Sequence, residues 1–147
     1  MKQKNQFAYP AIVKQGKVAR VVQFVDVPEA ITQVDEGEDL EVEAREILIL
    51  AISERMRDGR EIPEASASRR GKVVVSLPLW FAAKVALHKT MTARRYKNAD
   101  LARLLGVPSA EVARMLNPER RIKIDTIAEA IESMGGEMTV SFSAEPC

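Results

Sequence analysis

One short segment, residues 109–117, gathers side chains that can recognise DNA. Arginine and serine can hydrogen-bond to base edges in the major groove, so we assign Arg114 and Ser109 to bases. The methyl groups of Ala110 and Ala113 can touch thymine methyls. Asn117 and Arg103 are expected to contact bases or phosphates, and Arg120, Arg121 and Lys123 are expected to contact phosphates. The complete set expected to contact DNA is Ser109, Ala110, Ala113, Arg114, Asn117, Arg103, Arg120, Arg121 and Lys123.

Two short helices joined by a tight turn must position these side chains. In residues 98–117, Asn98 can cap the first helix, Gly106 breaks it, and Ser109 can cap the second. The apolar residues recur at helical spacing, with Ala102 small enough for the second helix to cross. This pattern predicts a helix-turn-helix, and the alternative is a helical hairpin with a structural role only. The expected apolar positions are Leu101, Ala102, Leu104, Leu105, Val107, Val112, Met115 and Leu116.

The charge of the surrounding segment favours the DNA-binding interpretation. Residues 88–124 contain nine Lys or Arg side chains and three acidic ones, a net charge of +6. Neutralising phosphates and releasing counterions supplies most non-specific DNA affinity. The alternative is a solvated basic surface with no nucleic-acid partner.

Catalytic chemistry finds little support in the sequence. Asp26, Asp35 and the acidic group at residues 36–39 could supply carboxylates for a divalent metal, but the first two strands contain no acidic residue for such a site. The one histidine, His88, has no nucleophile signature beside it, and no glycine-rich phosphate loop is present. We expect no catalytic residue, metal or cofactor. With a single cysteine, Cys147, we also expect no internal disulfide.

The N-terminal part is predicted to form a sheet covered by one helix. Residues 7–13, 18–25 and 30–34 read as three antiparallel strands, with Pro10 favouring an edge or the open side of the first. A helix is expected at residues 39–57, ending at Gly59, with Ile49 and Leu50 widening its apolar stripe. A connector at about residues 63–71 then leads to a fourth strand. That strand, at residues 72–77, completes a β-β-β-α-β domain, residues 1–77.

Residues 78–147 are predicted to be a second, all-α domain, which makes the fold class α+β. One helix precedes the hairpin, and another, capped by Asp125, follows it and stops at Gly135. Residues 138–142 read as a final strand that could pair with a second copy of the chain. No apolar run suggests a signal peptide or membrane span, so we expect a cytoplasmic protein without membrane association.

An acidic segment separates the sheet from the helix that covers it. Residues 26–46 contain nine carboxylates against one basic residue, Arg45, a net charge of −8. Some of these carboxylates favourably oppose the helix dipole. The rest form either a solvated face or a docking surface for a basic partner.

The order of these segments resembles the HicB antitoxins of bacterial type II toxin–antitoxin modules. The resemblance rests on YPAIV at 9–13, on VQFVDVPEAITQ at 22–33, on the end of the long helix from Asp58-Gly59 to Ile62-Pro63-Glu64, and on the helix-turn-helix followed by Lys123-Ile124-Asp125. It is closest to the subgroup with a helix-turn-helix. Family members have Thr-x-Gly shortly before the helix, whereas here Thr32-Gln33 is followed by Val34-Asp35-Glu36-Gly37, a longer loop.

The resemblance implies a partial RNase H-like N-terminal domain that binds HicA, a small basic toxin that cleaves mRNA. It also implies a C-terminal domain that forms a homodimer and represses the operon's own promoter by binding operator DNA; pairing of two dimers into a tetramer is the alternative assembly. An acidic domain suits a partner whose cleft must hold RNA. We hypothesise that Phe24, Asp26, Pro28 and Glu29 lie near the toxin contact. The alternatives are a stand-alone transcriptional repressor whose N-terminal domain senses a small molecule, and a metal-dependent nuclease.

Overall fold

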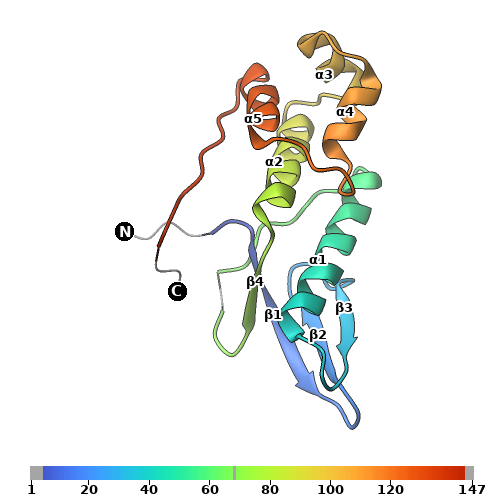
Figure 1. Ribbon diagram of the computed structural model, residues 1–147, viewed down its shortest axis with the longest axis vertical. Coiled ribbons are helices and arrows are strands. Elements are labelled where there is room, and N and C mark those ends of the chain that lie inside the picture. Colours follow the sequence, from blue (N-terminus) through green and yellow to red (C-terminus); the bar gives the residue numbers. More distant parts are fainter. Residues whose placement is uncertain (1–4, 68, 145–147) are drawn as a thin grey trace. The chain divides into compact units, whose positions relative to one another are not determined.

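The computed structural model describes residues 5–67 and 69–144. Their strands are β1 (Ala8–Gln15), β2 (Arg20–Phe24), β3 (Ile31–Val34) and β4 (Val73–Ser76). Their helices are α1 (Leu40–Arg57), α2 (Leu79–Ala93), α3 (Asn98–Leu105), α4 (Ser109–Leu116) and α5 (Ile124–Ser133) (Figure 1). The predicted α+β class is therefore confirmed.

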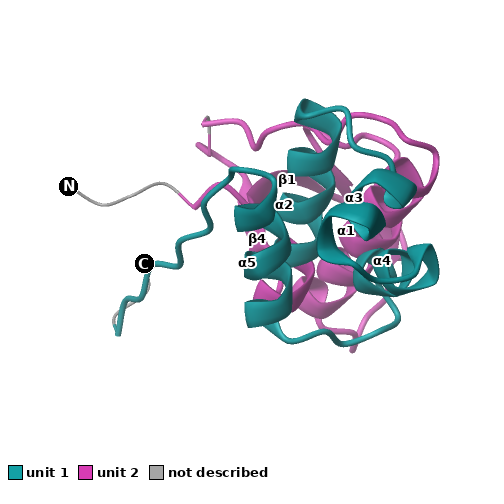
Figure 2. Cartoon of the chain, turned by 90° about the horizontal axis from the view of Figure 1, so that it is seen from above, with its two compact units in different colours: residues 1–4, 83–147 teal, residues 5–82 magenta. Residues whose placement is uncertain are grey.

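The described residues divide into two compact units, 5–82 and 83–144 (Figure 2). The division falls inside α2, close to the boundary that the sequence suggests at Pro78. The assignment of a separate function to each unit stays a prediction.

The first unit contains one four-stranded antiparallel sheet in the order β3-β2-β1-β4. The β1–β2 hairpin closes where the N–H of Gly16 donates to the carbonyl of Ala19 at 2.8 Å. A Cβ at Gly16 would lie 2.6 Å from that same oxygen, so this turn requires glycine. The fourth strand returns beside β1, which gives the expected β-β-β-α-β arrangement.

Pro10 lies in β1, which is not an edge strand, so of the two predicted positions the edge is wrong and the open side of the strand remains. Its carbonyl accepts a hydrogen bond from the N–H of Val25 at 3.1 Å, one residue past the end of β2. In an antiparallel strand the N and C=O of one residue face the same neighbour. The missing N–H of Pro10 therefore faces the end of the β1–β2 ladder, which stops at the pair Ala11 and Phe24.

Helix α1 packs against the sheet through one apolar face. The carboxylate of Asp39 caps it by accepting from the N–H of Val42 at 3.1 Å. Leu48 and Ile52 are fully buried, and each such side chain stabilises the fold by about 1.5–3 kcal/mol. Leu50 is 55% exposed, so the expectation that it widens the buried stripe is wrong. It lies about 200° around the helix from Leu48 and faces away from the sheet.

The second unit is built around one apolar core shared by its helices. Residues from α2, α3, α4 and α5 contribute to it, with Leu87, Leu101, Val112 and Ile127 all fully buried. This agrees with the predicted group of one helix before the hairpin and one after it. The helix α5 ends before Gly135 as expected, but its N-cap is Lys123 and Asp125 lies inside the helix, which corrects the predicted cap.

The expected strand at residues 138–142 is not present in the described chain. A strand needs a partner for its backbone N–H and C=O groups, and no strand of the second unit offers one there. Val140 is 58% exposed and Phe142 90% exposed. Pairing with a second copy stays a prediction. No helix in residues 5–67 and 69–144 has the length and apolar character needed to cross a bilayer.

Candidate functional site

Two short helices joined by a turn, α3 and α4, lie where the sequence predicts them, but the N-cap of each lies one residue before the predicted one. The N-cap of α3 is Lys97, and the carboxylate of Asp100 accepts from its backbone N–H at 2.8 Å. This bond fixes the start of the helix, so Asn98 is its first residue and not its cap. Likewise Pro108 is the N-cap of α4 and Ser109 is its first residue.

The turn between the helices depends on Gly106. This residue has a left-handed backbone conformation, with φ 69° and ψ 33°, which favours glycine. The N–H of the next residue, Val107, donates to the carbonyl of Ala102 at 3.0 Å and satisfies the end of α3. The extended backbone of Pro108 then starts α4 in a new direction.

Buried apolar residues hold the two helices together. Leu101 and Val112 are fully buried, and Ala102 and Met115 are 4% and 2% exposed. Val107 packs against the same core, as the sequence predicts. The exposed faces of α3 and α4 are therefore fixed relative to each other. Leu104, at 45% exposed, lies on the outside.

The residues expected to contact DNA lie together on the surface of this hairpin and of the segment that follows it. All are exposed except Asn117, which is half-buried. Arg114 forms two hydrogen bonds with Glu111, at 2.6 and 3.2 Å, and this contact lowers the pKa of Glu111. Arg103 lies 3.8 Å from Asp100. Both arginines therefore have carboxylate partners that a DNA phosphate or base would have to displace.

Asn117 has a local structural role. Its side-chain oxygen accepts from the N–H of Glu119 at 2.9 Å and shapes the turn after α4. Its side-chain NH₂ can still donate to a base or phosphate. Arg120, Arg121 and Lys123 follow this turn, and all are exposed.

Lys84 on α2 was not predicted from the sequence as part of this site. Its Nζ donates to the carbonyl of Met115 at 2.7 Å, near the C-terminal end of α4. Burial, followed by the positive charge of Arg114, lowers the pKa of Lys84 to about 8. One signal was available: Lys84 interrupts the apolar run FAAKVAL at residues 81–87.

In the first unit, Asp26 binds the connector that precedes β4. Its carboxylate accepts from the N–H of Ser66 at 2.8 Å and also from the hydroxyl of Ser66. The hydroxyl of Tyr9 donates to the carbonyl of Pro63 at 2.8 Å. Burial and then the charge of Asp26 raise the pKa of Tyr9 to about 12. The predicted connector is thus attached to the sheet, although Ser68 lies outside the described residues.

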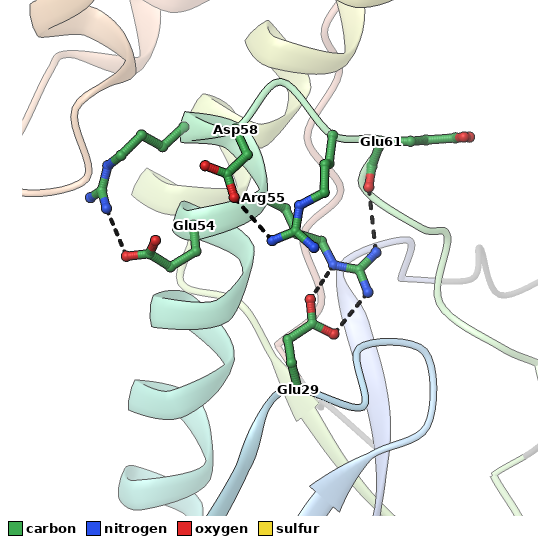
Figure 3. A network of polar contacts seen from close by, with 7 residues as sticks. Glu29, Glu54, Arg55, Asp58 and Glu61 are labelled. Atoms are coloured by element: carbon green, nitrogen blue, oxygen red, sulfur yellow. Dashed lines mark hydrogen bonds and ion pairs between the residues drawn. The ribbon is translucent and has the colours of Figure 1, made fainter.

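Glu29 forms a two-pronged ion pair with Arg55 of α1 (Figure 3). The oxygen–nitrogen distances are 2.5 and 2.8 Å. The hydrogen bond from Arg55 lowers the pKa of Glu29 to about 2. Neighbouring pairs, Glu54 with Arg57 and Asp58 with Arg60, lie at the same end of α1.

The four residues expected near a toxin contact have different environments. Phe24 is 1% exposed and belongs to the core, so its side chain is not offered to a partner. Asp26 is half-buried, whereas Pro28 and Glu29 lie at the surface. The structure therefore leaves Pro28 and Glu29 as the accessible members of this set.

The acidic loop before α1 carries further exposed charge. Asp35, Glu36, Glu38 and Asp39 are all exposed. Partial loss of hydration, and then the carboxylates of Glu38, Glu46 and Asp39, raise the pKa of Glu43. Mutual repulsion at this surface would be relieved by a basic partner. Within residues 5–67 and 69–144, no group of three or more Asp, Glu, His or Cys side chains is placed to hold a metal ion.

Comparison with known proteins identifies relatives along most of the chain. A model of the HicB-like antitoxins of bacterial toxin–antitoxin systems matches residues 8–86, which is more than half of the chain. Antitoxin HicB 2 of Photorhabdus laumondii is 39% identical over 127 residues, covering 86% of this chain and 90% of that protein. Antitoxin HicB of Escherichia coli K12 is 30% identical over 120 residues, covering 82% and 87%. The chain therefore belongs to the HicB-like antitoxin family of bacterial toxin–antitoxin systems.

Proposed function

We propose that this protein is a cytoplasmic antitoxin that neutralises a HicA-type mRNA-cleaving toxin and represses its own operon. In this proposal residues 5–82 form the partial RNase H-like toxin-binding domain. Residues 83–144 form the helix-turn-helix domain that binds operator DNA. The protein itself carries no enzymatic activity, and no metal or cofactor takes part.

The observation that carries the DNA-binding part is the exposed face of α4 on a rigid hairpin. Ser109, Ala110, Ala113 and Arg114 are all exposed, while Val112 and Met115 on the opposite face are buried. This division lets α4 enter a major groove without loss of packing. The basic residues after α4 are available to phosphates on the flanking backbone.

Repression by a helix-turn-helix protein commonly uses two copies on a two-fold-symmetric site. We expect a homodimer that reads two half-sites about 34–36 Å apart, or a multiple of that distance. The exposed Val140 and Phe142 are the residues expected to support contact between copies. Equilibrium sedimentation of the full chain and of a Phe142→Ser variant tests this: the variant is expected to dissociate at a higher concentration.

The toxin-binding part rests on charge. A ribonuclease that holds RNA presents positive charge at its cleft, and the acidic surface of residues 26–46 is suited to attract it and exclude RNA. The loop at residues 35–39 and the nearby surface of Pro28 and Glu29 supply exposed positions for that contact.

Co-expression tests the proposed function. A small basic protein encoded next to this gene should arrest growth when expressed alone, and this chain should restore growth and co-purify with it. If the chain binds its upstream DNA but rescues no neighbouring toxin, the alternative of a stand-alone repressor is favoured. If the purified chain cleaves RNA with Mg²⁺ or Mn²⁺, the proposal of a non-enzymatic antitoxin is wrong.

A further inference from the structure

Among the described residues, Lys84 is a charged side chain that is fully buried. It lies on α2, in the apolar core shared with α3, α4 and α5. Its neighbours along α2, Ala83 and Leu87, are fully buried as well. Burying an ammonium group is unfavourable unless a hydrogen bond compensates for the lost water.

The compensating acceptor is the backbone of α4. The Nζ of Lys84 donates to the carbonyl of Met115 at 2.7 Å. Met115 is the penultimate residue of α4, where helix carbonyls lack partners inside the helix. A cation at this position also interacts favourably with the negative end of the helix dipole. The contact therefore links α2 to the C-terminal end of α4 by a directional bond.

The charged group nearest to this ammonium opposes its positive charge. Arg114, the residue before Met115, carries a like charge, but its guanidinium is directed to Glu111 by two hydrogen bonds. The carboxylate of Glu111 thus partly neutralises the cation nearest to Lys84. If α4 moved away from α2, the Nζ of Lys84 would lose the carbonyl of Met115, and a buried charge would be left without a hydrogen-bond partner.

We propose that Lys84 is a positioning residue for DNA recognition, because it fixes the C-terminal end of α4 and with it the direction of Arg114 and Asn117. This inference rests on the proposed function of α4. Lys84 itself touches no DNA, since it is fully buried. Its loss should therefore reduce discrimination between operator and random DNA, while the salt dependence of binding stays unchanged because no phosphate contact is removed.

The test compares three variants of the full chain. Lys84→Met keeps a long flexible side chain without a donor, and Lys84→Gln keeps an uncharged N–H donor. The control is Ile131→Val, which removes one methylene from the same core on a different helix, α5. We expect the ratio of operator to random-DNA affinity to fall about ten-fold in Lys84→Met, less in Lys84→Gln, and not in Ile131→Val.

A second measurement separates positioning from folding. Amide hydrogen exchange at residues 115–117 should accelerate in Lys84→Met more than exchange in α5, and circular dichroism should show an unchanged helix content. If Lys84→Met does not fold, a slowly exchanging ammonium signal of Lys84 in the wild-type chain is still expected, and rapid exchange there would contradict the proposal. If folded Lys84→Met keeps the wild-type ratio of operator to random-DNA affinity, the positioning role of Lys84 is refuted, while the proposed function of α4 is not. Absence of operator preference in the wild type refutes the proposed function, and this inference with it.

Discussion

The ion pair between Glu29 and Arg55 gives the most quantitative prediction. The pKa of Glu29 falls from 4.5 to about 2, a difference worth about 3 kcal/mol at 1.36 kcal/mol per pKa unit. The side chain of Glu29 is 37% exposed and that of Arg55 is 18% exposed, so solvent screening reduces this value. We expect Glu29→Gln to lower the free energy of unfolding by about 1–2 kcal/mol at pH 7.

The pH dependence follows from the direction of the shift. Because the folded state lowers the pKa of Glu29, the stabilisation is complete above pH 4.5 and is lost as the pH falls toward 2. Urea unfolding followed by the fluorescence of Trp80, the single tryptophan and a residue of the first unit, measures this at several pH values.

The matched control is a second ion pair on the same helix. Glu54 and Arg57 lie 2.7 Å apart with side chains 47% and 65% exposed (Figure 3). Such an exposed pair contributes about 0.2–0.5 kcal/mol, so Glu54→Gln should have a small effect. A stabilising role of the Glu29–Arg55 pair is refuted if Glu29→Gln costs no more than Glu54→Gln, or if the cost of Glu29→Gln does not decrease as the pH falls below 4.5.

An exchange of the two charges separates stability from toxin binding. The double variant Glu29→Arg with Arg55→Glu restores an ion pair with opposite polarity, so it should recover most of the stability lost in either single variant. If Glu29 lies at the toxin contact, the exchanged pair should still bind toxin more weakly than wild type does. Wild-type toxin affinity in the exchanged variant would show that Glu29 contributes only to folding.

Three further predictions concern the second unit. Arg114→Ala should reduce operator preference by about 5- to 150-fold, whereas Lys123→Ala should weaken binding to all sequences equally and flatten the salt dependence, as DNA titrations at several salt concentrations will show. Gly106→Ala should cost about 1 kcal/mol in thermal unfolding, because φ is 69° although no atom lies within 4 Å of the new Cβ. The pKa of Lys84 is about 8 in the folded chain against 10.5 for the ordinary side chain, so the unfolded chain binds more protons between these pH values. The free energy of unfolding of the wild type should therefore rise relative to that of Lys84→Met by about 3 kcal/mol between pH 8 and 10.5. A constant difference between the two free energies over this range would contradict the prediction.

Local patterns predicted most elements of the fold. The alternating strands, the period of α1 and the left-handed Gly106 are encoded by neighbouring residues, so the sequence reveals them directly. The N-caps of α3 and α4 lie one residue before the predicted ones, because the carboxylate of Asp100 and the extended backbone of Pro108 set where these helices start. The expected terminal strand failed because a strand requires a partner that local sequence cannot supply.

Contacts between distant residues were beyond the reach of sequence patterns. Asp26 and Glu29 read as free carboxylates, yet their partners Ser66 and Arg55 lie 40 and 26 residues away in the sequence. Lys84 interrupts an apolar run, but the sequence does not show that its partner is on α4, and lysine is almost never fully buried. The exposure of Ser109, Ala110, Ala113 and Arg114 was easier to predict, because helical spacing alone separates these residues from the buried face of α4.

The most direct test of the central claim is a titration of the purified chain against the DNA upstream of its own gene, with random DNA of equal length as competitor. The proposed function predicts a protected site with two half-sites about 34–36 Å apart, or a multiple of that distance, and a preference that decreases in Arg114→Ala. Equal affinity for upstream and random DNA at low salt would contradict the assignment of α3 and α4 as an operator-binding helix-turn-helix.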